Sequence, residues 1–224
     1  MNFIQDNLNN ISKNLNDNIT LVAVSKTKPA SLIQEAYLAG QRIFGENKVQ
    51  EMTSKHLELP KDIQWHMIGH LQRNKVKYIA PFVTLIHAVD NLKLAKEIDK
   101  QAKKNERTIN CLLQLKIAQE ETKFGLSKKD LLAILPELLA LENINIVGLM
   151  GMASFSSDKT QVKNEFKSLK MLFDQLKQTT FKAKNDFNTL SMGMSGDYKI
   201  AIEAGSTMVR VGSAIFGTRN YQNS

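Results

Sequence analysis

Lys26 is the residue whose position first suggests chemistry. It follows the apolar run 21–24, and Pro29 shortly afterwards prevents a strand from continuing. A run this apolar is typical of a strand covered on both faces, where an ammonium group costs several kcal/mol unless it is paired or neutral. Two interpretations stay open: a salt-bridged lysine in the core, or a lysine kept partly deprotonated for Schiff-base chemistry.

Two loops near the C-terminus have the composition of an anion site. The segment 191–197, SMGMSGD, places two serines and two glycines before an expected helix, and 209–217, VRVGSAIFG, repeats the pattern. Either loop alone is better explained by a plain turn. Together, after the last two strands of a barrel and opposite a strand-end lysine, they indicate a phosphate site. An amine facing a phosphate site suits an aldehyde cofactor with a phosphate tail, pyridoxal 5'-phosphate, with Lys26 as its imine partner.

Arg210 would limit what such a cofactor could do. It precedes Gly212 by two residues on an expected strand, so both face the same side. An arginine stays protonated, and one placed against the pyridine nitrogen would keep that nitrogen unprotonated and weaken the ring as an electron sink. An arginine paired with an acidic residue in the barrel interior explains the position equally well.

The histidines predict no metal site. His66 and His70 are four residues apart but straddle a strand end, and His56 and His87 have no partner at ligand spacing. The single cysteine, Cys111, lies in an apolar run and is expected to be a small buried side chain.

Composition narrows the class of protein. The net charge is +8, but the lysines are scattered, which is typical of a solvated surface and does not favour nucleic-acid binding. No apolar run approaches the ~20 residues of a membrane span, and the Asn-rich N-terminus does not resemble a signal peptide. We therefore expect a cytoplasmic protein with no membrane partner.

Strand and helix patterns alternate along the whole chain. Apolar residues at spacings of four, three and four predict an N-terminal helix (Ile4, Leu8, Ile11 and Leu15). Strands are predicted at 21–24, 42–46, 64–68, 84–89, 108–115, 144–150, 189–192 and 207–211. Eight such units without a linker favour an α/β fold, a (β/α)8 TIM-type barrel with an additional N-terminal helix, as one domain over 1–224. An open doubly wound sheet is the alternative, and it is disfavoured because no G-x-G-x-x-G follows the first strand.

Several helix ends can also be predicted. Asn47 and Asp90 are each expected to be the N-cap of the helix that follows. Ser127 opens another helix, with Asp130 in a capping-box arrangement. Pro136 must kink or break that helix, and the sequence does not decide which.

Six segments carry a resemblance to a known family. They are AVSKTKP (23–29), FGENKVQE (44–51), WHMIGHLQRNK (65–75), GLMGM (148–152), SMGMSGD (191–197) and GSTMVRVGSAIFG (205–217). Over nearly its whole length the sequence resembles the pyridoxal phosphate homeostasis proteins, single-domain relatives of the alanine racemase N-terminal barrel.

The resemblance implies a site and a role. It places the cofactor as an internal aldimine on Lys26, with Asn47 as a motif residue of the site and Arg210 against the pyridine. Its phosphate contacts fall on Ser195, Gly212 and Ser213. It implies a protein that keeps vitamin B6 pools in balance by holding pyridoxal phosphate and handing it to apo-enzymes, with no established reaction and no catalytic residue.

The competing interpretation is an amino-acid racemase. Two-base racemisation needs a second acid/base group on the opposite face of the substrate α-carbon, which the racemases supply as a tyrosine from an added β-domain of a partner subunit. The sequence shows no such domain before it ends at Ser224, and its tyrosines fall on expected helices or the tail (Tyr37, Tyr78, Tyr198 and Tyr221). The carrier is therefore preferred, and without that domain a monomer is expected.

Overall fold

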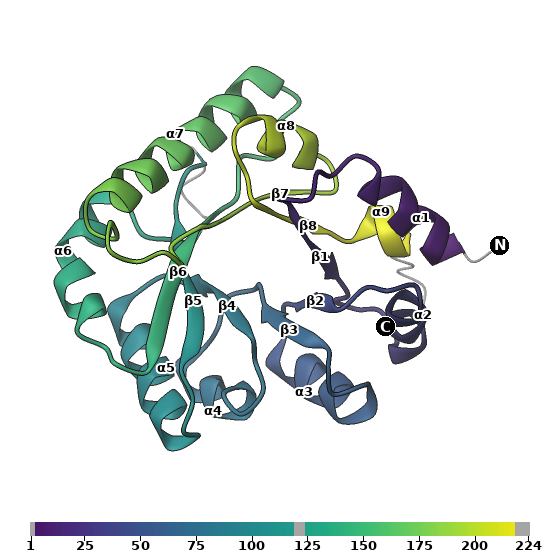
Figure 1. Cartoon of the computed structure of the whole chain (residues 1–224), viewed down its shortest axis with the longest axis horizontal. Coiled ribbons are helices and arrows are strands. Elements are labelled where there is room, and N and C mark those ends of the chain that lie inside the picture. Colours follow the sequence, from purple (N-terminus) through teal and green to yellow (C-terminus); the bar gives the residue numbers. More distant parts are fainter. Residues whose placement is uncertain (1–2, 119–123, 218–224) are drawn as a thin grey trace.

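The chain folds into a closed barrel. The computed structural model describes residues 3–118 and 124–217, and in these ranges eight parallel strands pair in sequence order (Figure 1). The strands are β1 (Thr20–Val24), β2 (Ile43–Glu46), β3 (Gln64–Met67), β4 (Leu85–Val89), β5 (Ile109–Leu115), β6 (Ile144–Gly151), β7 (Thr189–Met194) and β8 (Met208–Val211). The first and last strands close the barrel, with Val22 paired to Arg210. The predicted barrel is confirmed.

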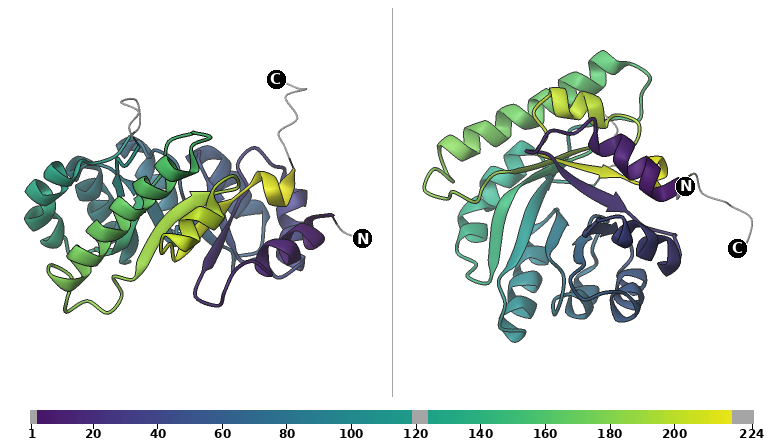
Figure 2. Two further views of the ribbon diagram at one scale, coloured as in Figure 1. Left: turned by 90° about the horizontal axis from the view of Figure 1, so that it is seen from above. Right: turned by 45° about the vertical axis from the view of Figure 1, so that its right-hand side comes forward.

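Helices surround the strands (Figures 1 and 2). They are α1 (Phe3–Ser12), α2 (Ala30–Leu38), α3 (Val49–Glu58), the 3-10 turn η1 (Arg73–Lys75), α4 (Val76–Ile79), α5 (Leu92–Lys104), α6 (Lys128–Leu139), α7 (Lys159–Gln178), α8 (Tyr198–Glu203) and α9 (Ser213–Phe216). No helix in the described ranges is both long and apolar enough to cross a membrane.

The predicted N-terminal helix is present as α1, but it ends at Ser12, so Leu15 lies beyond it. The helix buries Ile4, Leu8 and Ile11, and it contacts both α2 and α9. The Asn7 side-chain amide donates to the Ile215 carbonyl of α9 at 2.9 Å, so α1 is tied to the C-terminal end of the fold.

Alternation along the strands separates two apolar clusters. The larger cluster lies between the strands and the helices and includes Ala23 and Val209. A smaller one takes the alternate positions, which face the barrel interior, among them Val22, Leu112 and Met208. Arg210 has the same parity as Met208, and so it also belongs to the interior.

Two predicted caps are each wrong by one residue. Helix α3 begins at Val49, and Lys48 precedes it in extended conformation, so Asn47 stays in the loop. Asn91, not Asp90, caps α5, because its side chain accepts from the Leu94 N–H at 2.8 Å.

Asp90 is used elsewhere. It follows β4 directly, where one carboxylate oxygen lies 3.1 Å from His70 Nδ1 and the other accepts from the side chain of Asn91. These two contacts hold the Asp90 carboxylate, and the Asn91 side chain caps the helix instead.

Helix α6 has the predicted start. The Ser127 hydroxyl accepts from the Asp130 N–H at 3.0 Å and donates to the Asp130 carboxylate at 2.6 Å. The helix runs through Pro136 to Leu139, so the proline does not break it.

Candidate functional site

A cavity of about 610 Å³ opens at the carboxyl ends of the strands. Its volume falls in the range that small ligands and cofactors occupy. Every residue predicted for the site lines it: Lys26, Asn47, Ser195, Arg210, Gly212 and Ser213. These residues come from the segments at or after β1, β2, β7 and β8, which barrel closure brings to one place.

The loops after β7 and β8 are bonded to each other. The Gly212 N–H donates to Ser195 Oγ at 3.1 Å, and the Met194 N–H donates to the Asp197 carboxylate at 2.6 Å. A Cβ at Gly196 would meet no atom within 4 Å, so this edge of the cavity leaves space for a ligand. Hydroxyl and backbone N–H groups gathered around such a space fit a phosphate.

Arg210 is a buried cation in the lining. It is 3% exposed, and its guanidinium donates to Ser191 Oγ at 2.6 Å and to the Gly151 carbonyl at 3.2 Å. Among the residues described it forms no ion pair, so the pairing with an acidic residue does not occur there. Burial lowers the pKa of Arg210 to about 10, against the opposing effect of Asp197. The guanidinium is therefore still charged at neutral pH.

Two histidines extend this network into the barrel interior. Ser191 Oγ lies 3.2 Å from His87 Nδ1, and His87 Nε2 lies 3.1 Å from His66 Nδ1. Burial lowers the pKa of His66 to about 3 and that of His87 well below its usual value, with His66 and Arg210 adding to the effect on His87. Both imidazoles are therefore neutral at neutral pH.

The donors in this network can be ordered. Because Arg210 has only donors, Ser191 accepts from it and has its own proton left for His87 Nδ1. His87 then has its proton on Nε2 and donates to His66 Nδ1. The guanidinium of Arg210, which can only donate, thus favours the Nε2–H tautomer for both histidines. No group of three or more metal-ligating side chains occurs in the described part of the chain.

Lys26 lies two residues beyond β1 and is half-buried in the cavity lining. The neighbouring main chain is unusual, since Thr27 has a φ of +63°, in the left-handed region that residues with a Cβ rarely occupy. The loop that presents Lys26 therefore has a conformation that needs support from its surroundings.

Asn47 is placed in the lining by a close approach of two loops. A Cβ at Gly69 would lie 2.8 Å from the Asn47 carbonyl oxygen, so only glycine fits there. Gly69 follows β3, and the segments after β2 and β3 thus pack main chain to main chain beside the cavity.

Sequence reasoning missed several polar side chains of the lining, and Gln114 and Ser154 are two of them. Gln114, near the end of β5, donates to the Phe124 carbonyl at 2.9 Å, and Ser154, after β6, is bonded to Glu165 through its N–H at 2.6 Å and its hydroxyl at 2.8 Å. Gln114 could have been predicted for the site, because it is a polar residue at the carboxyl end of the apolar run 109–115. No comparable sequence signal marks Ser154.

Fold and cavity together define the class: a barrel of the kind that forms the N-terminal domain of alanine racemase. The model of that family, described as "Alanine racemase, N-terminal domain", matches residues 1–220. A solved alanine racemase from Bartonella henselae is similar with a TM-score of 0.76 at 16% identity, over 99% of this chain and 63% of that one. This likeness concerns the fold alone.

Nearer relatives narrow the class. The pyridoxal phosphate homeostasis protein of Haemophilus influenzae is 38% identical, over 100% of this chain and 96% of the relative. PipY of Synechococcus elongatus, solved without PLP, is similar with a TM-score of 0.90 at 37% identity, over 96% of this chain and all of that one; it has also been solved with PLP bound, at a TM-score of 0.88. The chain belongs to the pyridoxal phosphate homeostasis protein family.

Proposed function

We propose that this protein binds pyridoxal 5'-phosphate reversibly through Lys26 and serves the homeostasis of that cofactor by holding it and handing it on. The observation that carries the proposal is the convergence of Lys26, Arg210 and the bonded pair Ser195–Gly212 on one cavity. Relatives of matching length bear the homeostasis name, and PipY has been solved with PLP bound.

Each of the six predicted site residues would have a role in this proposal. Lys26 would hold the cofactor through its amine, and the cofactor would supply the aldehyde with which that amine forms an imine. Ser195, Gly212 and Ser213 would hold the phosphate through hydroxyl and N–H groups. Arg210 would face the pyridine nitrogen, and Asn47 would line the same cavity.

The same arrangement favours a carrier over a racemase. A charged guanidinium at the pyridine nitrogen keeps that nitrogen unprotonated, which weakens the ring as an electron sink. Among the tyrosines that the structure describes (Tyr37, Tyr78 and Tyr198), none lines the cavity to act as a second base, and Tyr221 lies outside the described residues. The proposal extends to a monomer in the cytoplasm that passes the cofactor to apo-enzymes.

Trapping the bound cofactor tests the proposal. Protein mixed with pyridoxal 5'-phosphate and reduced with borohydride is expected to carry the label on Lys26, as mapped by peptide mass spectrometry, and Lys26→Ala is expected to lose both the label and the yellow absorbance. Lys96→Ala is the control, because the Lys96 ammonium pairs with Glu137 at 2.7 Å on the surface and Lys96 lies outside the cavity lining, so labelling of Lys26 should be unchanged. Labelling that persists in Lys26→Ala contradicts the proposed attachment.

A second assay separates carrier from racemase. The loaded protein is incubated with alanine in deuterated water, and loss of the α-hydrogen is followed by NMR. A carrier leaves the α-hydrogen in place, whereas exchange at an enzyme-like rate would establish the racemase instead.

A further inference from the structure

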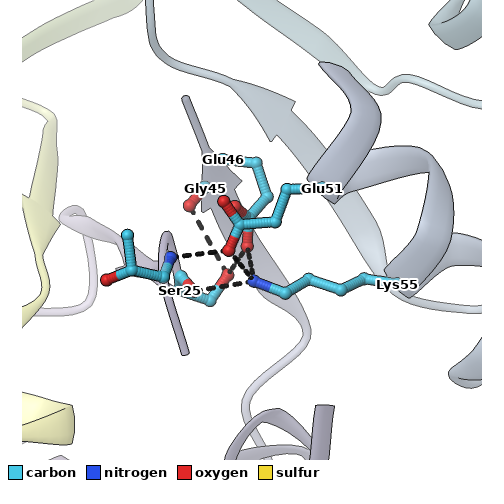
Figure 3. Close-up of polar contacts among 6 residues, drawn as sticks. Ser25, Gly45, Glu46, Glu51 and Lys55 are labelled. Atoms are coloured by element: carbon cyan, nitrogen blue, oxygen red, sulfur yellow. Dashed lines mark hydrogen bonds and ion pairs between the residues drawn. The ribbon is translucent and has the colours of Figure 1, made fainter. Parts of the chain in front are cut away.

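A buried ionic cluster supports the loop that presents Lys26 (Figure 3). Lys55 of α3, whose side chain is 7% exposed, donates to three oxygens: Glu46 Oε1 at 2.8 Å, Glu51 Oε1 at 2.6 Å and the Ser25 carbonyl at 2.8 Å. We call Ser25, Glu46, Glu51 and Lys55 the Lys55 cluster.

The cluster holds the main chain on both sides of Lys26. Before it, Ser25 is fixed through its carbonyl by Lys55, through its hydroxyl by Glu46 at 2.6 Å and through its N–H by the Gly45 carbonyl at 3.0 Å. After it, the Thr27 N–H donates to Glu51 Oε1 at 2.6 Å. Lys26 is thus the one residue between two anchored peptide units, with its side chain in the cavity lining.

The bond from Thr27 to Glu51 explains the unusual backbone. A left-handed conformation is unfavourable for a residue with a Cβ. The charge-assisted bond from the Thr27 N–H to Glu51 compensates for it, and Lys55, one turn further along α3, holds the Glu51 carboxylate in place.

The composition of the cluster argues against a role in stability alone. It places the buried Glu46 and the partly exposed Glu51 beside one ammonium, and burial raises the pKa of Glu46 although Lys55 opposes this. Apolar side chains of similar volume would fill such a space at no greater cost. They could not accept from the Thr27 N–H or donate to the Ser25 carbonyl, and the cluster supplies these two contacts at the ends of Lys26.

We infer that Lys55, acting through Glu51 and the main chain of Ser25 and Thr27, is a positioning residue for the Lys26 amine. The inference rests on the proposed function for what the amine does. The positioning itself belongs to the protein without cofactor, because the contacts that produce it are all within the chain.

Two variants and a control test this role. Lys55→Met removes the three donors and keeps the length of the side chain. Glu51→Ala removes the acceptor of Thr27 at a partly exposed position, whereas Glu51→Gln keeps an oxygen there and is expected to restore part of the effect. Lys170→Met is the matched control, because Lys170 makes the same i,i+4 pair with Asp174 away from the cavity.

The first readout needs no cofactor. Amide hydrogen exchange in the segment 25–28 is expected to accelerate in Lys55→Met and Glu51→Ala, and to stay at the wild-type rate in Lys170→Met. Unchanged exchange in both cluster variants overturns the inference. Circular dichroism shows whether each variant is folded. If Lys55→Met is unfolded, the exchange rates of Glu51→Ala alone decide the question.

The second readout follows imine formation. The rate at which pyridoxal 5'-phosphate reacts with Lys26 is expected to fall about 10- to 100-fold in the cluster variants, since small displacements of a reacting group have effects of this size. Labelling should still map to Lys26. A wild-type rate in both variants overturns the inference and leaves the proposed function intact, whereas a wild-type protein that never labels at Lys26 overturns the proposed function itself.

Discussion

Acid should weaken this barrel through the two histidines in its interior. In the folded protein the pKa of His66 is lowered to about 3 and that of His87 lies well below 6.5, because both rings are buried. In the unfolded chain both rings take up a proton near pH 6.5. Below that pH the unfolded state binds more protons than the folded state, and so the free energy of unfolding falls as the pH falls.

The size of the effect can be worked out for His66. A histidine that stays neutral in the folded state loses about 1.4 kcal/mol of stability for every pH unit below 6.5 until its folded pKa is reached. Between pH 7 and pH 5 this amounts to about 2 kcal/mol for His66, and the lowered pKa of His87 adds a loss of the same sign. The contribution of His66 alone should lower the melting temperature by roughly 4–8 °C in a chain of this length.

Urea unfolding at pH 7, 6 and 5 measures how the free energy of unfolding changes with pH. His66→Gln is expected to remove about 2 kcal/mol of the difference between pH 7 and pH 5, and His87→Gln is expected to reduce that difference as well. Leu112→Ala is the control: it lowers the stability at every pH by opening a cavity in the same interior cluster, and it should leave the pH difference unchanged. If the double histidine variant loses as much stability between pH 7 and pH 5 as the wild type, the assignment of the acid effect to these rings is wrong.

Two further changes have outcomes fixed by contacts described in the structure. Gly148→Ala would place its Cβ 1.7 Å from the Thr189 carbonyl oxygen and push β6 away from β7, so thermal melting should show a loss of stability of about 3 kcal/mol or more. Gly40→Ala is the control: Gly40 has a φ of +100° but open space around it, so the loss should be only about 1–2 kcal/mol. Equal losses in the two variants would contradict the packing argument. Ser191→Ala removes the acceptor of the Arg210 guanidinium and should cost about 2 kcal/mol in urea unfolding, and a loss under about 0.5 kcal/mol would show that the guanidinium finds another partner.

The barrel could be predicted because its signal is repeated along the chain. Most strands are short and mainly apolar and the longer helices are amphipathic, so an error of a residue at one end does not change the order of the elements. The predicted caps at Asn47 and Asp90 were wrong because a cap is a single local feature that no repetition supports. A cap depends on which of two adjacent polar residues turns back toward the helix, and at Asp90 that choice was made by a contact with His70, twenty residues away.

The cavity lining could be predicted because carboxyl ends of barrel strands meet at one face, so position along a strand was enough for Lys26, Arg210 and Gly212. The partners of these residues could not be predicted. The parity of His66 and His87 shows that both can face the interior, but their contact depends on the register of β3 against β4, which the sequence does not state. The link from Thr27 to Glu51 likewise joins a turn to a helix through side-chain geometry alone.

The pairing of β1 with β8 has a consequence for the newly made protein. Val22 and Ala23 pair with Arg210 and Val211, so two neighbouring parts of the cavity lining, at Lys26 and at Arg210, come from segments far apart in the chain. Lys26 and Arg210 are 184 residues apart, and at about 5–20 residues per second the ribosome makes the lysine roughly 10–40 s before the arginine. During that interval the lysine has neither the guanidinium nor the β8 loop opposite it. Only a chain translated as far as its last strand can have this site, and so the ability to bind there reports that synthesis has passed β8 and that the barrel has closed.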